Sequence, residues 1–395
     1  MKLTDRISSV GASATLAVTN KAKEMKAQGI DVVSYGAGEP DFDTPKFLKE
    51  AAKAALDAGF TKYGPAAGIP ELRKAIAEKL VRENGLHVTA DQVTITAGGK
   101  HALYNASQVL LQKGDKMLIP APYWVSYPEF AKLAEAEPVF IPTGPKAHFK
   151  ITPDQVLQYA KLPGAKVLVL NSPSNPTGVS YTPSELKALA EAVLKTNLIV
   201  FSDEIYEKLI YGDTEFVSFG SLSPELEART ITFNGLSKTY AMTGWRLGWA
   251  AGPKDVIQAM NRLMSHQVSN IPIFLQKAAV KAYTEPQTEV QAMREQFEKR
   301  GVHMHQRLCA MKGITCVKPD GAFYCFPDVS AHYGRTLGGM EVKGSMDFAK
   351  AALDAVKVAL IPGGAFGEDA CVRLSFATSM EQIDKGLDRL ADLLK

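Results

Sequence analysis

The sequence has few cysteines, and no pattern arranges them around a metal ion. The four that occur lie in the last quarter of the chain and form no C-x-x-C pair: Cys309, Cys316, Cys325 and Cys371. Closely spaced cysteines are typical of zinc sites and of small disulfide-bonded secreted proteins. We therefore expect buried free thiols, no metal site and a reducing, cytoplasmic environment.

Long apolar runs are also missing. No uninterrupted stretch approaches the roughly 20 residues that a membrane-spanning helix needs. Near the start of the chain, Asp5, Arg6 and several serines and threonines interrupt any apolar segment, so we predict no secretion signal. The expectation is a cytoplasmic protein without a membrane partner.

An excess of charge of either sign is absent as well. Lysine and arginine number 45 against 42 aspartates and glutamates, which gives a net charge of +3. Because nucleic-acid-coating proteins carry a strong basic excess, we expect no nucleic-acid partner, although a local basic pocket is compatible with this balance. The phosphate-binding pattern G-x-x-x-x-G-K-[S/T] does not occur either, which argues against an NTPase.

The sequence does contain a regular alternation of helix-like and strand-like segments. At 395 residues the chain is long enough for two domains. Helical spacing of apolar residues occurs at 45–58, 71–84 and 184–195. Seven strand-like runs lie at 93–96, 116–120, 138–142, 166–170, 198–203, 230–234 and 247–252. Strands that alternate with helices predict βαβ units and a mostly parallel sheet.

The pattern of predicted helices and strands changes after about residue 285. A long charged helical stretch at 288–311 leads into shorter strands and an amphipathic helix at 380–395. We predict a large domain at 46–285 and a small α+β domain at 286–395. Residues 1–45 are glycine-rich and predicted to be irregular, and they form an N-terminal arm and part of the small domain.

Polar residues follow four of the predicted strands, at the edge where open α/β sheets bind ligands. After the strand at 93–96, Gly98, Gly99 and Lys100 precede a helix, whose N-terminus favours an anion. After the strand at 166–170, the segment 171–178 is a turn rich in asparagine and proline. Either segment taken alone is also compatible with a purely structural turn.

The other two strands lead to charged residues. Asp203 ends one strand and Tyr206 follows three residues later; a buried carboxylate there needs a partner. Lys238 follows the strand at 230–234 among largely apolar neighbours, so desolvation should lower its pKa and make the amine nucleophilic toward an aldehyde. Arg246, eight residues later, has the planar group that suits a phosphate.

These parts together fit one cofactor. Pyridoxal phosphate has a phosphate that needs N–H donors and an arginine, a pyridine nitrogen that needs a carboxylate, and an aldehyde that needs a lysine. The sequence therefore predicts a pyridoxal-phosphate site at the carboxyl edge of the sheet.

The same residues resemble a known family. Residues 235–248, GLSKTYAMTGWRLG, resemble the cofactor-lysine signature of class I aminotransferases, closest to the prokaryotic aspartate aminotransferases and to the prephenate and aromatic aminotransferases of that group. The resemblance implies fold type I, with a mostly parallel seven-stranded sheet in a large domain and a smaller α+β domain. It extends through GEPDF at 38–42, KYGP at 62–65, APYWVSYP at 121–128, NSPSNPTG at 171–178, SDEIY at 202–206, GAFY at 321–324 and VRLSFAT at 372–378.

Matching positions imply which residues bind the cofactor. Lys238 is the implied catalytic residue, which bonds to the cofactor aldehyde and moves the substrate proton. Many members have serine three residues before this lysine, where Gly235 of this chain offers no hydroxyl. Asp203 is implied to face the ring nitrogen, Tyr206 and Asn175 the ring oxygen, and Trp124 the ring face. The implied phosphate contacts are Arg246, Ser237, Gly99 and Lys100.

The resemblance also implies how an amino acid or a 2-oxo acid binds. Arg373 clamps the α-carboxylate with help from the Gly38 backbone, and Trp124 and Asn175 border the same site. In similar enzymes a lysine at the position of Lys100 binds the distal carboxylate of aspartate or glutamate. The alternative is that Lys100 contacts only phosphate or solvent.

The predicted function is ping-pong transfer of the amino group of L-aspartate to 2-oxoglutarate, which gives oxaloacetate and L-glutamate. Tyr63 is implied to reach the phosphate in a partner subunit, so we expect a homodimer with shared active sites. The alternatives are a prephenate or aromatic aminotransferase and a C–S lyase on the same fold. A regulator of this fold usually has a preceding DNA-binding domain, which we do not expect because the motifs begin near residue 38.

Overall fold

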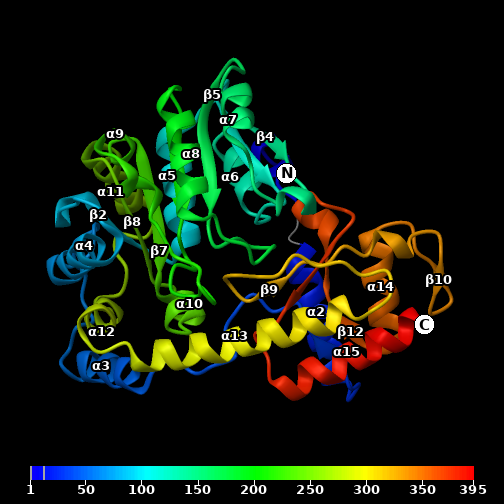
Figure 1. Cartoon of the computed structure of the whole chain (residues 1–395). Helices are drawn as coiled ribbons and strands as arrows, with labels where there is room; N and C mark the ends of the chain where they lie inside the picture. Colours follow the sequence, from blue (N-terminus) through cyan, green and yellow to red (C-terminus); the bar gives the residue numbers. More distant parts are fainter. Residues whose placement is uncertain (1, 12–13) are drawn as a thin grey trace.

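A seven-stranded sheet dominates the larger part of the computed structural model, which describes residues 2–11 and 14–395 (Figure 1). The strand order is β2-β8-β7-β6-β5-β3-β4, and within this sheet β8 alone runs antiparallel to the rest. The predicted α/β class is confirmed. The seven predicted runs form β2 Val93–Thr96, β3 Lys116–Ala121, β4 Glu137–Pro142, β5 Ala165–Asn171, β6 Ile199–Asp203, β7 Thr230–Gly235 and β8 Gly248–Ala251.

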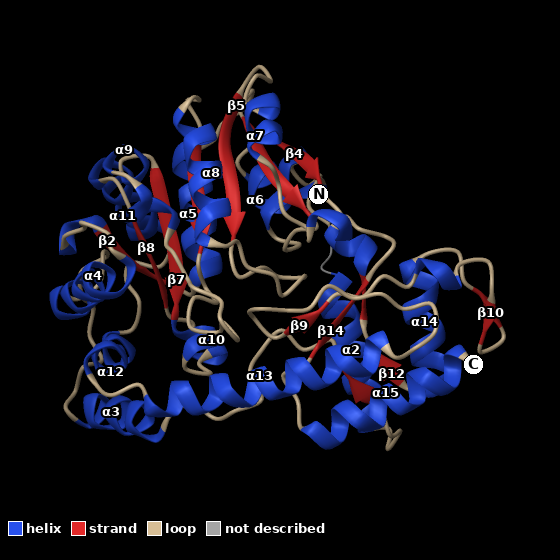
Figure 2. Ribbon diagram, in the orientation of Figure 1, coloured by secondary structure: helices blue, strands red, loops and turns tan. Residues whose placement is uncertain are grey.

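Helices cover both faces of the sheet (Figure 2), and successive residues of β5 pack against opposite layers of them. Val167 and Val169 belong to the apolar core beneath α5, α6 and α11, whereas Leu168 and Leu170 belong to the core beneath α7 and α8. This alternation follows from the two-residue period of a strand, and apolar residues on both faces are typical of a sheet covered on both sides.

The helices of this part follow the predicted pattern of apolar spacing. The α4 helix is capped by Gly85, whose φ of 66° is the left-handed conformation that glycine adopts easily just after a helix. The bounds are α3 Lys46–Asp57, α4 Pro70–Asn84, α5 Gly99–Leu110, α6 Tyr127–Leu133, α7 Pro153–Tyr159, α8 Pro183–Leu194, α9 Pro224–Glu227, α10 Leu236–Thr239, α11 Lys254–Gln267 and α12 Ile273–Thr284.

The C-terminal part joins the N-terminal segment in one core. Strand β1 (Val33–Ser34) pairs in parallel with β12 (Val358–Ala359), and the Tyr35 hydroxyl donates to the Ile383 carbonyl at 2.6 Å. The long helix α13 spans the two parts (Figure 1). The remaining elements are α13 Thr288–Cys309, α14 Ser345–Val356, α15 Met380–Leu394, β9 Tyr324–Cys325, β10 Thr336–Leu337, β11 Met340–Glu341, β13 Ile361–Pro362 and β14 Val372–Ser375.

Two expectations from the sequence are wrong. The first 45 residues are not irregular, because they contain the short helix α1 (Asp5–Ser8) and the 14-residue helix α2 (Ala14–Ala27), which lies against β12 and β13. The four free cysteines are not all buried, because Cys309 is exposed at the end of α13 and Cys316 is half-buried in the loop that follows. No helix in the described ranges is both long and apolar enough to cross a membrane.

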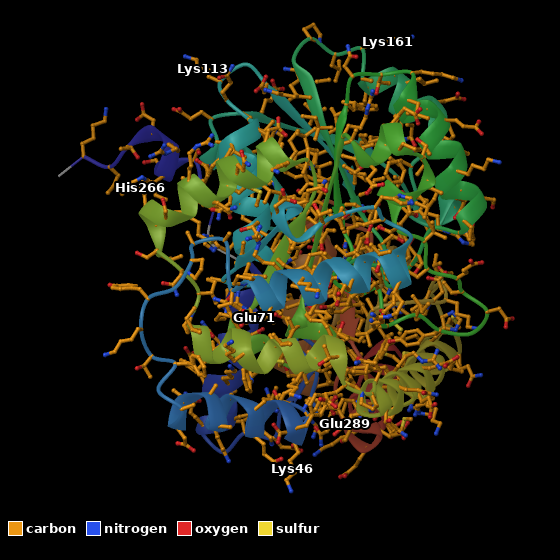
Figure 3. All side chains as sticks on the ribbon, turned by 90° about the vertical axis from the view of Figure 1, so that its left-hand side faces the viewer. Lys46, Glu71, Lys113, Lys161, His266 and Glu289 are labelled. Carbon is orange, nitrogen blue, oxygen red and sulfur yellow. The ribbon has the colours of Figure 1, made fainter. Side chains whose placement is uncertain are left out.

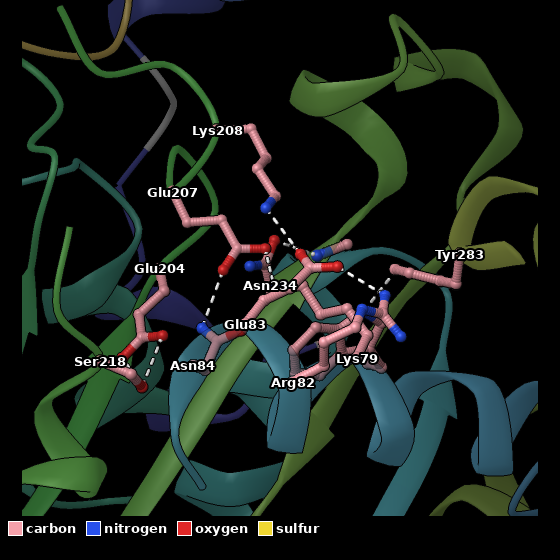
Figure 4. Close-up of polar contacts among 12 residues, drawn as sticks. Lys79, Arg82, Glu83, Asn84, Glu204, Glu207, Lys208, Ser218, Asn234 and Tyr283 are labelled. Atoms are coloured by element: carbon pink, nitrogen blue, oxygen red, sulfur yellow. Dashed lines mark hydrogen bonds and ion pairs between the residues drawn. The ribbon is translucent and has the colours of Figure 1, made fainter. Parts of the chain in front are cut away.

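Charged side chains mostly point into solvent, as Lys46, Glu71 and Lys161 do (Figure 3), but one ion pair is buried. Lys79 of α4 donates to Glu207, which follows β6, and both side chains are less than a tenth exposed. Asn84 completes the group: its Oδ1 accepts from Lys79 at 2.7 Å and its Nδ2 donates to Glu207 at 2.9 Å (Figure 4). This group ties α4 to the segment after β6.

Lys79→Met should destabilise the fold, because it leaves the buried Glu207 carboxylate without its cation. We expect a loss of about 3–5 kcal/mol in the free energy of unfolding, the usual effect of removing one partner of a buried pair. Urea denaturation at a fixed cofactor concentration measures it. Lys208→Met is the control, because Lys208 pairs with Glu83 at 2.6 Å near the surface and such pairs contribute less than about 1 kcal/mol. Equal losses in the two variants would contradict the assignment.

Candidate active site

A cavity of about 670 Å³ lies at the carboxyl edge of the sheet and is bordered on its other side by residues of the C-terminal part and of α2. Side chains from both parts of the molecule reach it, because β5, β6 and β7 end there and β14 approaches from the other side. Eleven of the twelve predicted site residues line it: Gly38, Gly99, Lys100, Trp124, Asn175, Asp203, Tyr206, Ser237, Lys238, Arg246 and Arg373.

A buried acid lies at the end of β6. Asp203 is 5% exposed; its Oδ2 accepts from the Tyr127 hydroxyl at 2.6 Å and its Oδ1 from the Ile205 amide at 3.3 Å. Burial raises the pKa of Asp203 to about 6, and the hydrogen bond from Tyr127 opposes that rise. The buried Tyr206 hydroxyl lies 2.9 Å from that of Tyr324. The site therefore offers a carboxylate that gains stability from a cationic partner.

The amine of Lys238 opens into the same cavity. Lys238 is the third residue of α10, next to the buried Ser237, and its Nζ donates to the Gly38 carbonyl. The amine also lies 5.7 Å from the centre of the Phe323 ring. Desolvation lowers the pKa of Lys238 to about 8, Glu39 opposes the fall, and neighbouring cations add to it. A larger fraction of this lysine is thus neutral near neutral pH than of a lysine in water.

An anion cradle forms where β2 meets α5. Gly98 has a φ of 84°, and a Cβ there would lie 2.6 Å from an Nη of Arg246, so only glycine lets the guanidinium approach. Arg246 donates to the carbonyls of Ala97 at 3.2 Å and Thr243 at 2.9 Å, which fixes its orientation. Gly99 begins the 12-residue α5, whose first N–H groups and dipole favour an anion.

A second arginine is buried without an acidic partner. Arg373 is 3% exposed; it donates to Asn175 Oδ1 at 2.8 Å and to the Gly36 carbonyl at 3.1 Å. Its guanidinium carbon lies 4.5 Å from the centre of the Tyr324 ring and 5.1 Å from that of Phe366. Its Nε has no hydrogen-bond partner, and no carboxylate within the described ranges pairs with it. A buried cation in this state is expected to bind an anionic ligand.

Trp124 and Lys100 form the outer wall of the cavity. The Lys100 amine lies 5.0 Å from the centre of the Trp124 ring, close enough for a cation–π contact. Lys100 remains open to solvent, yet partial desolvation and the charge of Arg246 lower its pKa. The pair therefore offers a cation and an aromatic face to the same ligand.

Tyr63 is the predicted site residue that does not line this cavity. It lies in the loop between α3 and α4, and 90% of its side chain is exposed. It does not contribute to the cavity of its own chain, and its predicted role in a partner subunit stays a prediction.

Sequence reasoning missed three groups of the site. Tyr127, which holds Asp203, lies three residues after Trp124 in the APYWVSYP motif, and Tyr324 is the last residue of the GAFY motif. Both lie inside motifs noted in the sequence, but their partners Asp203 and Tyr206 are more than 70 residues away, and no local pattern reveals these contacts. The third is Gly36: its carbonyl contacts Arg373, whereas the carbonyl of the predicted Gly38 accepts from Lys238.

Comparisons with known proteins identify the family. The model described as aminotransferase class I and II matches residues 30–390. The chain belongs to this family. It is 49% identical to an aspartate aminotransferase of Geobacillus stearothermophilus over 99% of this chain and 98% of the relative. It is 46% identical to an aspartate/prephenate aminotransferase of Cereibacter sphaeroides over 98% of this chain and 97% of the relative.

Solved structures share the whole fold of this aminotransferase. The aspartate aminotransferase of Rhizobium meliloti has a TM-score of 0.96 at 39% identity and covers 100% of this chain and 99% of its own. The aspartate aminotransferase of Thermus thermophilus with maleate has a TM-score of 0.94 at 42% identity, and the match covers 100% of both chains. The predicted family, fold and enzyme class are therefore confirmed.

Enzymes of this family use pyridoxal phosphate, and the residues of the cavity fit that group. The glycine and arginine cradle matches a phosphate, the buried Asp203 matches a ring nitrogen, and the Lys238 amine of lowered pKa matches an aldehyde. Arg246, Asp203 and Lys238 all line this one cavity.

Gly98→Ala should weaken the binding of pyridoxal phosphate to the aminotransferase, because the added methyl group displaces Arg246. We expect the dissociation constant to rise about 10- to 100-fold, the equivalent of one lost charge-assisted hydrogen bond. Equilibrium dialysis of the cofactor measures it. Gly114→Ala is the matched control, because Gly114 also has a positive φ, 95°, but nothing lies within 4 Å of its added methyl group. Unchanged affinity in Gly98→Ala would contradict the phosphate cradle.

Proposed function

We propose that this aminotransferase binds pyridoxal phosphate covalently at Lys238 and transfers the amino group of L-aspartate to 2-oxoglutarate. The observation that supports this most strongly is one cavity that contains the Lys238 amine, the buried Asp203 and the unpaired Arg373. The full-length identity to curated aspartate aminotransferases supports the choice of substrates.

Different residues of the cavity would contact different parts of the cofactor. Arg246, Ser237 and the amides at the start of α5 would hold the phosphate. Asp203 would face the ring nitrogen and keep it protonated, with Tyr127 fixing the orientation of the carboxylate. The remaining proposed contacts are Tyr206 and Asn175 for the ring oxygen and Trp124 for the ring face. Bound pyridoxal phosphate supplies an aldehyde that takes up an amino group and a cationic ring that accepts electrons from the substrate.

Lys238 would move the proton of the reaction. A general base works best when its pKa lies near the working pH, and the value of about 8 for Lys238 meets this condition. Its amine donates to the Gly38 carbonyl, so an amine that has taken the proton of the substrate Cα would hold that proton within the cavity. Desolvation thus serves both the bonding and the proton-transfer roles of one side chain.

Arg373 would bind the α-carboxylate of the substrate. Asn175 and Gly36 already hold two of its nitrogens, so the guanidinium is oriented before the substrate arrives. Lys100 would bind the distal carboxylate of a dicarboxylic substrate from the outer wall. The Thermus thermophilus relative was solved with maleate, a four-carbon dicarboxylate, which supports a site for two carboxylates.

A second copy of the chain would complete the site. Tyr63 is a large aromatic residue with 90% of its surface exposed, and it does not line the cavity of its own chain. In a homodimer, Tyr63 would reach the phosphate of the cofactor that the partner subunit binds. The exposed side chain would then contact both the partner and its ligand.

The covalent bond at Lys238 should form with the pH dependence of a neutral amine. We expect the rate at which the apoenzyme takes up pyridoxal phosphate to rise about tenfold per pH unit and to level off above pH about 8, because only the deprotonated amine reacts. Borohydride trapping followed by mass spectrometry of the labelled peptide measures rate and position. Lys238→Arg should take up no label, whereas Lys100→Arg should keep it. Labelling at another lysine would overturn the proposal.

Lys100→Ala should separate dicarboxylic substrates from neutral ones. We expect the KM for aspartate to rise about tenfold, the loss of one hydrogen bond to a charged group, while the KM for phenylalanine changes little. A panel of amino donors with 2-oxoglutarate as acceptor measures both, with Lys113→Ala on the surface as the control (Figure 3). An equal rise for both donors would leave Lys100 as a contact to phosphate or solvent. Prephenate as a good acceptor, or release of pyruvate from cystathionine, would point to the alternative activities.

A further inference from the structure

A basic stripe on α2 faces the active-site cavity. Thr19, Ala22, Lys23 and Lys26 are the residues of this helix that line the cavity. Their spacing of three, four and seven residues places them on one face of a helix. We call Lys23 and Lys26 the α2 lysines. Sequence reasoning assigned no role to this segment, because it predicted no helix there.

Apolar packing fixes which face of α2 is turned to the cavity. Ala22 and Met25 are buried in a small cluster with Val32 and Ala359, close to the pairing of β1 with β12. Since residues 22 and 25 are pinned against the C-terminal part, the neighbouring positions 23 and 26 are held at the rim of the cavity rather than free to rotate away. The orientation of the two lysines therefore follows from the core.

The α2 lysines have no internal role that would explain them. Both are exposed, and neither has an ion-pair partner within the part of the chain that the structure describes. Lys385 of α15, by contrast, pairs with Asp31 at 2.7 Å. Two unpaired cations at the mouth of a cavity attract anions from solution, an effect that salt weakens.

The charges inside the cavity extend this field. Lys100, Arg246 and Arg373 line it together with Lys238, whereas Glu39 and Asp203 are its acidic side chains. A bound phosphate would offset Arg246, and the α-carboxylate of a substrate would offset Arg373. The α2 lysines and Lys100 then remain on the outer side, where a second carboxylate of the substrate would point.

We propose that Lys23 and Lys26 are specificity-determining residues that draw dicarboxylic substrates into the active site more strongly than their monocarboxylic analogues. This inference rests on the proposed function. It assigns to the two lysines an effect on encounter and binding, and none on the chemical step. The effect grows with ligand charge, so a 2-oxo acid with two carboxylates should respond more than an amino acid whose ammonium group cancels one of them.

The test compares the holoenzyme of Lys23→Gln/Lys26→Gln with that of Lys21→Gln. Lys21 is an exposed lysine of the same helix that does not line the cavity, so its loss changes the charge of α2 without changing the stripe. We expect kcat/KM for 2-oxoglutarate to fall about tenfold at low salt in the double variant, with kcat unchanged, because steering effects start at about that size. The value for pyruvate should fall less than that for 2-oxoglutarate, and Lys21→Gln should match the parent.

Salt and binding give two further readouts. In the parent, added salt should lower kcat/KM for 2-oxoglutarate, and in the double variant this salt dependence should be clearly weaker. Binding of maleate to the holoenzyme, followed by the change in cofactor absorbance, should weaken in the double variant and stay unchanged in Lys21→Gln. Maleate binding needs no turnover, so it decides the inference even if the parent proves inactive toward aspartate, a result that would refute only the proposed function.

Three results would overturn the inference. They are an unchanged double variant, an equal loss for pyruvate and 2-oxoglutarate, or a loss in Lys21→Gln as large as that in the double variant. Because all three lysines are exposed, their replacement should leave the unfolding midpoint of the protein unchanged, which thermal denaturation checks.

Discussion

The rest of the site depends on one constraint: the Lys238 amine has only limited contact with water. Desolvation lowers the pKa of this lysine to about 8, whereas a lysine in water is almost fully protonated near neutral pH and so a poor nucleophile. The fold supplies the position by ending β7 at Gly235 and turning at once into α10. Gly235 has no space for a side chain, since a Cβ there would lie 2.8 Å from the Gly248 Cα of the next strand. Close packing of β7 on β8 thus determines where the amine lies.

The cavity also gathers cations that only a ligand can fully compensate. Arg373 has two oxygen partners and two aromatic rings around it but no carboxylate within the described ranges, and Arg246 is held by backbone carbonyls alone. These arrangements satisfy the geometry of the guanidinium groups without neutralising them. The cations that add to the effect of desolvation on the pKa of Lys238 therefore also favour anionic ligands.

The sequence predicted the central sheet and most of the cavity for a physical reason. Strands buried on both faces are continuous apolar runs, as VLVL at 167–170 is, and their carboxyl ends meet at one edge, so residues far apart in sequence could be placed together. Local patterns did not reveal how the α2 helix is held, because its buried residues Ala22 and Met25 pack near Ala359 of β12, more than 300 residues later. Nor could they reveal Tyr127 as the partner of Asp203, since that contact depends on how α6 packs over β6.

The cations lie in two places, inside the cavity and at its rim. This division would separate the selection of acidic substrates from the reaction itself. Buried hydrogen bonds hold Arg373, and backbone carbonyls hold Arg246, in one orientation, so changing either disturbs the reacting groups directly. The α2 lysines are exposed and attached to a helix whose packing depends on Ala22 and Met25, not on the lysines themselves. Their charge can therefore change without altering the sheet edge. A fold arranged in this way can change its preference for acidic substrates at the rim while Lys238 keeps its surroundings.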